Sequence, residues 1–286
     1  MDSKKLITVL KSGVVDPKTT ALALTATTTG AQAASFTSLG VISGKTVTID
    51  WGDGTIESFT TTASRAHAYA GAGTWAVKVG PRNAINRIDL YDTKFTVTID
   101  ATNPMPAGLT VLYMLNLHGL TWNVNATPMP SNLTYLRLLS LSGLTWNINT
   151  TPLPPSLDYF ECDQNSNITW NVSAISLPNT LRTFKIGWNV PGIVWTGMLP
   201  NAIQSAACYN SLDTAKIDTI LYTILANKAN FTYSTPSLDL SHWSNAAPSG
   251  TYQAADPVTS GKEAKYALVN GNGSYAPGPE WTVTTN

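Results

Sequence analysis

The chain has 286 residues, a formal net charge of zero and only 12% charged residues. This length allows about two domains with a substantial core. The low charge argues against nucleic acid and anionic membrane as partners, because both are attracted by a strong positive field. No stretch approaches the ~20 consecutive apolar residues of a membrane-spanning helix, so no membrane span is predicted.

The first 20 residues read "MDSKKLITVLKSGVVDPKTT". They contain lysines, but neither the apolar run nor the small-residue cleavage pattern of a secretory signal. We interpret residues 1–20 as an N-terminal arm. It either anchors the chain to a larger assembly or is a disordered start.

Residues 21–80 predict a small β-sandwich. Four short segments alternate apolar and polar residues, as half-buried strands do: "ALALTAT", "KTVTIDW", "TIESFTT" and "TWAVKV". Between the second and third segments, Asp53 and Gly54 predict a hairpin turn, because glycine adopts a positive φ without strain.

Two motifs in this region, "VTIDWGDGTIESF" and "HAYAGAGTWAVKV", resemble the PKD (polycystic-kidney-disease) domain. That family has a W-x-F-G-D-G hairpin followed by H-x-Y-x-x-x-G-x-Y-x-V. The matching residues are His67, Tyr69, Gly73 and Val77, whereas Trp51 is displaced and Trp75 replaces the second tyrosine. The resemblance implies an immunoglobulin-like sandwich in which His67 and Asp53 hold turns and strands. The alternative is a catalytic role for His67 with Asp50 and Asp53.

Residues 81–205 contain an internal repeat with a 24-residue period. The motif L-x-x-L-x-L begins at Ile85, Leu109, Leu133, Leu157 and Leu181. Prolines share the period at Pro106, Pro130, Pro154 and Pro178, and tryptophans nearly so at Trp122, Trp146, Trp170 and Trp195. The period and the motif predict a leucine-rich-repeat solenoid of 24-residue coils, in which stacking buries the apolar face of each coil.

A second strand is predicted in each coil, because "LTWNVN" and "LTWNIN" alternate apolar and polar residues. This alternation places the tryptophans inside, with their leucine and valine neighbours. The alternative is an exposed aromatic row that stacks on sugars. We therefore expect two short strands per coil, joined by a proline-rich turn, with no helix between them.

The outward positions of the first strand give the candidate site. One outward column contains Asp89, Tyr113, Arg137, Glu161 and Lys185, and the column beside it contains Arg87, Val111, Tyr135, Tyr159 and Thr183. We predict that Tyr113, Tyr135 and Tyr159 form an exposed patch which, with Arg137, binds a host surface protein or glycan, since tyrosine gives a large contact area at low entropic cost. The alternative is a charge ladder that only stabilises the stack.

No chemistry is predicted for the remaining reactive side chains. Cys162 and Cys208 are too few for a cysteine zinc site and too far apart for a disulfide, so we expect two buried free thiols. The three histidines lie in different regions, and no nucleophile or metalloprotease motif occurs. We therefore predict no catalytic residue, no cofactor and no metal, while paired carboxylates that hydrolyse a glycoside stay an alternative.

Residues 206–286 predict an α+β subdomain that caps the solenoid. Apolar residues recur at helical spacing from Leu212 to Ala229, and Asn210, Ser211 or Asp213 can cap this helix. A shorter helix is expected in "GKEAKYALVN", and strands are expected at Leu238–Leu240 and Trp281–Val283.

The order of these motifs resembles a group of leucine-rich-repeat proteins from Bacteroidetes-type bacteria and their phages. The resemblance rests on the "DWGDG" motif with its later H-x-Y, and on "LDTAKIDTIL", "LDLSHWSNAAPSG" and "EWTVTTN". It implies surface display and adhesion, not a reaction.

We therefore expect a non-enzymatic protein of the virion surface, such as a head fibre, a decoration protein or a tail-fibre component. Its N-terminal part would attach it to capsid or tail proteins, and its repeats would face the host. Homo-oligomerisation is left open. The alternatives are an extracellular adhesin of the bacterial cell surface and an enzyme acting on polysaccharide; the start of the chain, without a signal pattern, favours the virion.

Overall fold

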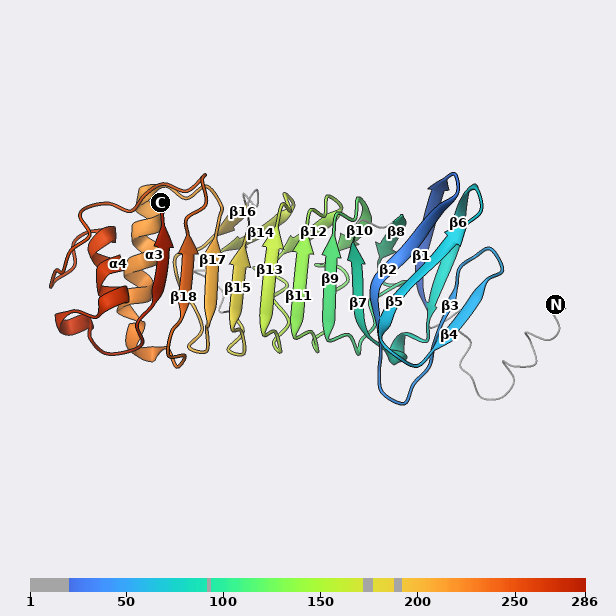
Figure 1. Cartoon of the computed structure of the whole chain (residues 1–286), viewed down its shortest axis with the longest axis horizontal. Coiled ribbons are helices and arrows are strands. Elements are labelled where there is room, and N and C mark those ends of the chain that lie inside the picture. The colour runs from blue at the N-terminus through green and yellow to red at the C-terminus, as the bar shows by residue number, and fades with distance from the viewer. Residues whose placement is uncertain (1–20, 92–93, 172–176, 188–191) are drawn as a thin grey trace. The chain divides into compact units, whose positions relative to one another are not determined.

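The computed structural model describes residues 21–91, 94–171, 177–187 and 192–286, so the expected N-terminal arm, residues 1–20, lies outside the described residues. With 39% strand and 13% helix the protein is mainly β, as expected, and it contains a β-solenoid of about five turns (Figure 1). The chain divides into two compact units. Unit 1 is Met1–Leu133 with Leu141–Leu144, and unit 2 is Thr134–Ser140 with Thr145–Asn286.

The described residues of unit 1 form ten strands and a short 3-10 helix. The strands are β1 (Leu22–Thr29), β2 (Gln32–Val41), β3 (Val47–Asp50), β4 (Ile56–Phe59), β5 (Ala63–Tyr69), β6 (Ala72–Gly80), β7 (Ile85–Tyr91), β8 (Phe95–Ile99), β9 (Val111–Leu115) and β10 (Gly119–Asn123), and the helix η1 is Arg82–Ala84. The four strands expected between residues 21 and 80 are confirmed as β1, β3, β4 and β6. Strands β2 and β5 are not predicted from the sequence, because their alanine and serine residues are weak strand formers.

The strands of unit 1 form two sheets. Their orders within the unit are β10-β8-β1-β6-β3-β4 and β9-β7-β2-β5. Pairing is antiparallel among β1–β6, and β8 and β7 pair antiparallel with β1 and β2 but parallel with β10 and β9. Both sheets therefore continue across residue 80, where the first coil joins the N-terminal strands without a break.

Aromatic rings join the two sheets of unit 1. Phe36 of β2 lies 4.8 Å from Phe95 of β8 between ring centroids, and Trp51 lies 6.3 Å from Phe36. All three side chains are buried. The hairpin between β3 and β4 is also confirmed, and Gly54 in its turn has a φ of +96°.

In the part of unit 2 that the structure describes there are nine strands, two α-helices and two 3-10 helices. The strands are β11 (Tyr135–Leu139), β12 (Leu144–Asn147, whose first residue belongs to unit 1), β13 (Tyr159–Asp163), β14 (Ile168–Asn171), β15 (Thr183–Ile186), β16 (Gly192–Val194), β17 (Ser205–Cys208), β18 (Ser237–Leu240) and β19 (Thr282–Thr285). The helices are α3 (Thr214–Ala226), η2 (Lys228–Asn230), α4 (Gly261–Asn270) and η3 (Gly273–Tyr275).

The strands of unit 2 belong to two sheets, each with parallel strands, which we call the first wall and the second wall. The first wall has the order β11-β13-β15-β17-β18-β19, and the second wall has the order β12-β14-β16. Tyr135 pairs with Tyr159 and Tyr159 with Thr183, so the expected 24-residue coil is confirmed in the first wall. Each coil crosses from one wall to the other, as the two strands per coil predicted.

Tryptophans fill the space between the two walls. Trp146, Trp170 and Trp195 are at most 4% exposed, which confirms that the column points inward. The rings do not stack on one another, because Trp146 lies opposite Ile168, two residues before Trp170. They pack edge to face against phenylalanines of the first wall, in the order Trp146, Phe160, Trp170, Phe184 and Trp195.

The tryptophans and prolines of the repeat also fix its turns. The indole Nε1 of Trp146 donates to the carbonyl of Thr151 at 2.7 Å, and that of Trp122 in unit 1 donates to Thr127 at 2.8 Å. The proline carbonyls accept from the backbone N–H three residues later, at Pro106, Pro130, Pro154, Pro178 and Pro200. The proline-rich turn before each first-wall strand is thus confirmed, and one repeat unit supplies both its core and its turns.

The C-terminal part of unit 2 extends the first wall. Helix α3 connects β17 to β18 and helix α4 connects β18 to β19, and these strands pair in parallel (Figure 1). Helices α3 and α4 and strands β18 and β19 were all predicted, and most of their ends were placed within two residues. Asp213 caps α3 by accepting from the N–H of Lys216, and the expected stripe is buried: Ile217, Ile220, Leu221, Ile224 and Leu225.

No helix in the described ranges combines the length and the apolar character needed to cross a bilayer.

Candidate functional site

The outward face of the first wall carries a stack of two tyrosines. Tyr135 of β11 and Tyr159 of β13 lie opposite each other in register, with ring centroids 4.4 Å apart and an angle of 14° between the rings. Both side chains are half-buried. The close parallel spacing of neighbouring strands holds the two rings face to face as one aromatic stack.

An ion pair lies beside this stack, one step along the same strands. Arg137 Nε is 2.9 Å from a carboxylate oxygen of Glu161, and the Arg137 guanidinium also donates to the other oxygen at 3.2 Å. The hydroxyl of Tyr159 donates to Glu161 as well. Burial and the carboxylate of Glu161 raise the pKa of Tyr159, so its hydroxyl stays a donor at physiological pH.

We call this group of five side chains the tyrosine face: Tyr135, Tyr159, Arg137, Glu161 and Lys185. Lys185 of β15 follows Glu161 in register, which confirms the predicted alternation of charge along the column. Its Nζ lies 6.0 Å from the centroid of the Tyr159 ring, at the outer limit of a cation–π contact. The predicted charge ladder and the tyrosine surface are therefore the same structure.

The column continues beyond the tyrosine face to Asp239. Ala207 of β17 follows Lys185 in register, and Asp239 of β18 follows Ala207. Asp239 accepts from the hydroxyl of Tyr209 at 2.6 Å and from the hydroxyl and the N–H of Ser241. Burial raises the pKa of Asp239, but these hydrogen bonds outweigh it and lower the pKa overall.

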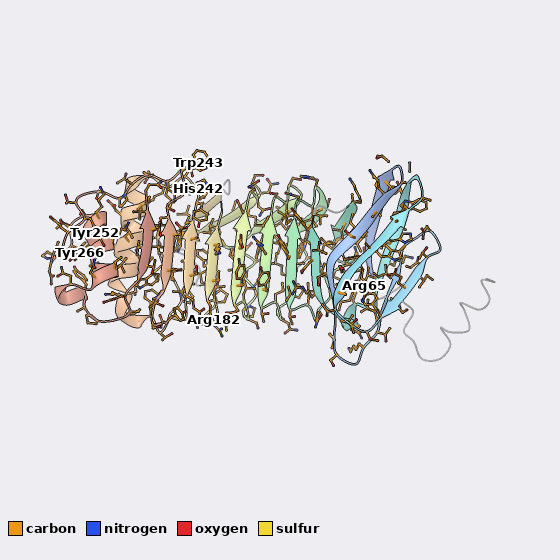
Figure 2. All side chains as sticks on the ribbon, viewed as in Figure 1. Arg65, Arg182, His242, Trp243, Tyr252 and Tyr266 are labelled. Atoms are coloured by element: carbon orange, nitrogen blue, oxygen red, sulfur yellow. The ribbon has the colours of Figure 1, made fainter. Side chains whose placement is uncertain are left out.

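A second ion pair lies at the starting edge of the same strands. Arg182 Nε is 3.3 Å from Asp158, which lies one period earlier in the chain, and both side chains are about half-exposed. Arg182 is labelled at this edge in Figure 2. Two ion pairs thus join consecutive coils, one half-buried and one exposed.

Tyr113 is the one predicted site residue that belongs to unit 1. It belongs to β9 of unit 1, opposite Asp89 of β7, whereas Tyr135 and Tyr159 belong to unit 2. Its side chain is half-buried, as are those of Tyr135 and Tyr159. The expectation of an exposed patch is therefore wrong in this respect: neighbouring side chains on the sheet cover part of each ring.

His67 and Asp53 in unit 1 are bound to their own hairpin. Asp53 accepts from the N–H of Thr55 at 2.9 Å and contacts His67 Nε2 at 2.6 Å. The His67 ring stacks on Trp51 and meets Tyr69 edge on, and the Tyr69 hydroxyl donates to the Trp51 carbonyl. Burial raises the pKa of Tyr69 to about 12. Each polar atom named here holds the turn or a strand.

The two cysteines are free and buried, as predicted. They lie two rungs apart in the first wall, since Cys162 pairs with Ile186 and Ile186 with Cys208. Burial raises the pKa of both thiols to about 12. Among the residues that the structure describes, no group of three or more His, Cys, Asp or Glu side chains is placed to hold a metal ion.

Comparison with family models, with curated proteins and with solved structures finds no match for this chain.

Several polar and aromatic side chains near the tyrosine face were not singled out from the sequence: Tyr209, Asp239, His242 and Trp243. The steps between β15, β17 and β18 depart from the regular period, so the repeat did not align Asp239 with Lys185. The segment "LDLSHW" predicts a strand and carries part of a family resemblance, but no binding role is predicted for it. Its signal was the pair of aromatic residues that follows shortly after the last strand residue, Leu240.

The tyrosine face and its continuation offer ring surfaces and hydrogen-bonding groups on a flat parallel sheet. Glu161 and Asp239 each bind neighbouring side chains of the protein, through Arg137 and Tyr159 or through Tyr209 and Ser241. Such an arrangement can hold a broad ligand by ring contact and by hydrogen bonds at the ring edges.

Proposed function

We propose that this chain is a non-enzymatic adhesion protein of a phage particle, which binds the host surface through the tyrosine face. It is displayed as a head fibre, decoration protein or tail-fibre component, with its N-terminal part attached to other virion proteins. The alternative location is the surface of a bacterial cell.

The proposal includes a finer description of the fold. The strands β1–β6 form a PKD-type immunoglobulin-like sandwich, and the coils are leucine-rich repeats. The first part is supported by the contacts of Trp51, His67 and Tyr69 at the hairpin. The second is supported by the 24-residue register and by the buried L-x-x-L-x-L positions, such as Leu157, Phe160 and Cys162.

The observation that carries the proposal is the fixed geometry of the two tyrosines. Their rings are parallel at 4.4 Å, and Tyr159 is tied to Glu161, which Arg137 holds in turn. A surface that is rigid before it binds loses little conformational entropy on binding. The proposal of a binding role rather than catalysis is supported by the partners of Glu161 and Asp239, which already occupy both carboxylates.

The location is tested by electron microscopy of purified phage particles labelled with gold-coupled antibody to this chain. We expect label on the capsid or the tail. Label on cell envelopes of uninfected bacteria, with none on particles, would contradict the virion location and support the cell-surface alternative.

The binding surface is tested with the double variant Tyr135→Ala and Tyr159→Ala. We expect adhesion of the purified protein to host cells to weaken by at least about tenfold, since aromatic anchors dominate binding energies. The matched control is Thr145→Ala with Thr169→Ala, two exposed side chains of the second wall. Equal adhesion of the tyrosine variant and this control would contradict the proposed surface.

A further inference from the structure

Trp243 is exposed, unlike Trp146, Trp170, Trp195 and Trp281, the other tryptophans of unit 2 that the structure describes. Trp243 is 76% exposed, the highest value among the large apolar side chains that the structure describes, whereas Trp146, Trp170 and Trp281 are at most 2% exposed. It lies just after β18, in the turn 241–245. Figure 2 shows Trp243 and His242 together at the edge of unit 2 where the strands of the first wall end.

Hydrogen bonds from Asn245 and Asn286 fix the turn that contains Trp243. The buried amide of Asn245 donates to the carbonyls of Cys208 and Leu240 and accepts from the N–H of Leu212. The N–H of Asn245 donates to the carbonyl of His242, and the side chain of Asn286 donates to the carbonyls of both His242 and Asn245. The exposed indole is therefore carried by a fixed backbone, as a preorganised binding group would be.

His242 presents a hydrogen-bond donor next to the indole. Its Nδ1 accepts from the backbone N–H of Ser244 at 3.3 Å and lies 2.7 Å from the Ser244 hydroxyl. A ring nitrogen that accepts an N–H has no proton of its own, so the other nitrogen, Nε2, carries the proton. The ring centroids of His242 and Trp243 are 5.2 Å apart.

The aromatic row continues from this turn onto the sheet. The rings of His242 and Tyr209 are 5.5 Å apart, and Tyr209 donates to Asp239. Asp239 in turn binds Ser241, at the base of the turn. Trp243, His242 and Tyr209 thus form a row of rings next to the Asp239 carboxylate and the Ser241 hydroxyl, so that both donors and acceptors lie close to the rings.

We infer that Trp243, His242 and Tyr209 form a subsite for one pyranose ring of a neutral glycan. This inference rests on the proposed function and names the ligand class of the host surface. The C–H groups on one face of a pyranose pack against the electron-rich face of the indole. The sugar hydroxyls, which both donate and accept, meet the His242 Nε2 proton and the hydroxyl oxygens of Ser244 and Tyr209.

The chemistry of the surroundings favours a neutral sugar over an acidic sugar or a protein. Asp239 is an acidic group in the subsite, and it would repel a sugar carboxylate. A protein interface is typically centred on a desolvated cluster of apolar anchors. Here the neighbours of Trp243 in the turn are Ser241, His242, Ser244 and Asn245, which hydrogen-bond and do not supply such a cluster.

The test compares purified wild-type protein with Trp243→Ala on an array of immobilised neutral and acidic glycans. We expect the wild type to bind a set of neutral glycans and Trp243→Ala to bind them at least about tenfold more weakly. Trp243→Phe, which keeps a ring, should retain part of the binding. The matched control is Tyr252→Ala, which removes another exposed aromatic ring of unit 2, labelled elsewhere in Figure 2.

Host cells separate this inference from the proposed function. We expect adhesion to fall after periodate oxidation of the cell-surface sugars and to survive proteinase treatment. Adhesion that is lost only with proteinase, or glycan binding that is equal in Trp243→Ala and wild type, would overturn the inference while leaving adhesion in place. A wild type that binds neither array nor cells would overturn the inference and the proposed function together.

Discussion

The two walls of unit 2 repeat to different degrees. On the second wall the outward residues recur from coil to coil, as Thr145 and Thr169 or as Asn147 and Asn171. On the first wall the outward residues of the ladder change from Arg137 to Glu161 to Lys185. The inward residues of both walls stay apolar throughout.

The difference follows from what a solenoid requires. Stacked coils need a constant core and constant turns, and the second-wall asparagines serve the turns: Asn147 accepts from the N–H of Asn149, and Asn149 accepts from that of Asn171. The outward ladder of the first wall is free of that requirement. Outward residues that differ from coil to coil therefore indicate that a binding surface lies on the first wall, where the tyrosine face is found.

The largest expected effect is a difference in stability between a buried and an exposed position of strand β12. Trp146→Ala should lower the free energy of unfolding by about 3–5 kcal/mol, because it removes a buried indole that packs against Phe160 and binds the Thr151 carbonyl. Its neighbour Thr145 is exposed, so Thr145→Ala should change this free energy by less than about 0.5 kcal/mol. Urea unfolding followed by circular dichroism measures both. A loss below about 1 kcal/mol for Trp146→Ala would contradict its role in the core.

A smaller effect is expected for the coupling energies of the two ion pairs of the first wall. In a double-mutant cycle with Arg137→Met and Glu161→Gln we expect a coupling energy of about 1 kcal/mol, because these side chains are only 32% and 17% exposed. The matched pair Arg182 and Asp158 is 58% and 47% exposed and should give less than about 0.5 kcal/mol. Both values should fall as salt is added. A larger coupling in the exposed pair would contradict the importance of burial.

The smallest expected effect is the contribution of Asp239 to the free energy of unfolding, and how that contribution changes at acid pH. The folded pKa of Asp239 is lowered, so the carboxylate stabilises the fold above its unfolded pKa of about 3.9, and this stabilisation is lost as pH falls through the folded pKa. Asp239→Asn should therefore be less stable than wild type near neutral pH, and the gap should close in acid. Tyr209→Phe, which removes one donor to the carboxylate, should show the same trend to a lesser degree. Thermal unfolding from acid to neutral pH measures it, and a gap that is constant with pH would contradict it.

Much of the fold was predictable because its signals are local or periodic. The 24-residue period places the first-wall strands, and helical spacing places α3 with its buried stripe from Ile217 to Leu225. What was missed depends on tertiary context. Strands β2 and β5 have weak strand propensity and are formed by pairing with each other and, for β2, with β7. The alternation of tryptophan and phenylalanine follows from a two-residue stagger of the second wall that no single coil reveals.

The candidate site was predictable only where register follows the period. Tyr135, Tyr159, Arg137 and Glu161 were placed correctly relative to one another, because the members of each pair lie one period apart. The half-burial of the rings was not predicted, because it depends on the rotamers of neighbouring side chains. Asp239 was missed because helix α3 and its flanking loops separate β18 from β17, and Trp243 was missed because a turn residue has no periodic partner.

The extension of the first wall beyond the coils has a consequence for how such a chain can change. The step from β15 to β17, between the partners Ile186 and Cys208, is slightly shorter than the period of the coils. The step from β17 to β18, between the partners Ser205 and Ser237, is clearly longer, yet parallel pairing continues. The additional residues between β17 and β18 form helix α3 and its loops, and the two strands still pair. The first wall and the connections between its strands can therefore vary separately: an insertion can lengthen a connection while the strands keep their spacing.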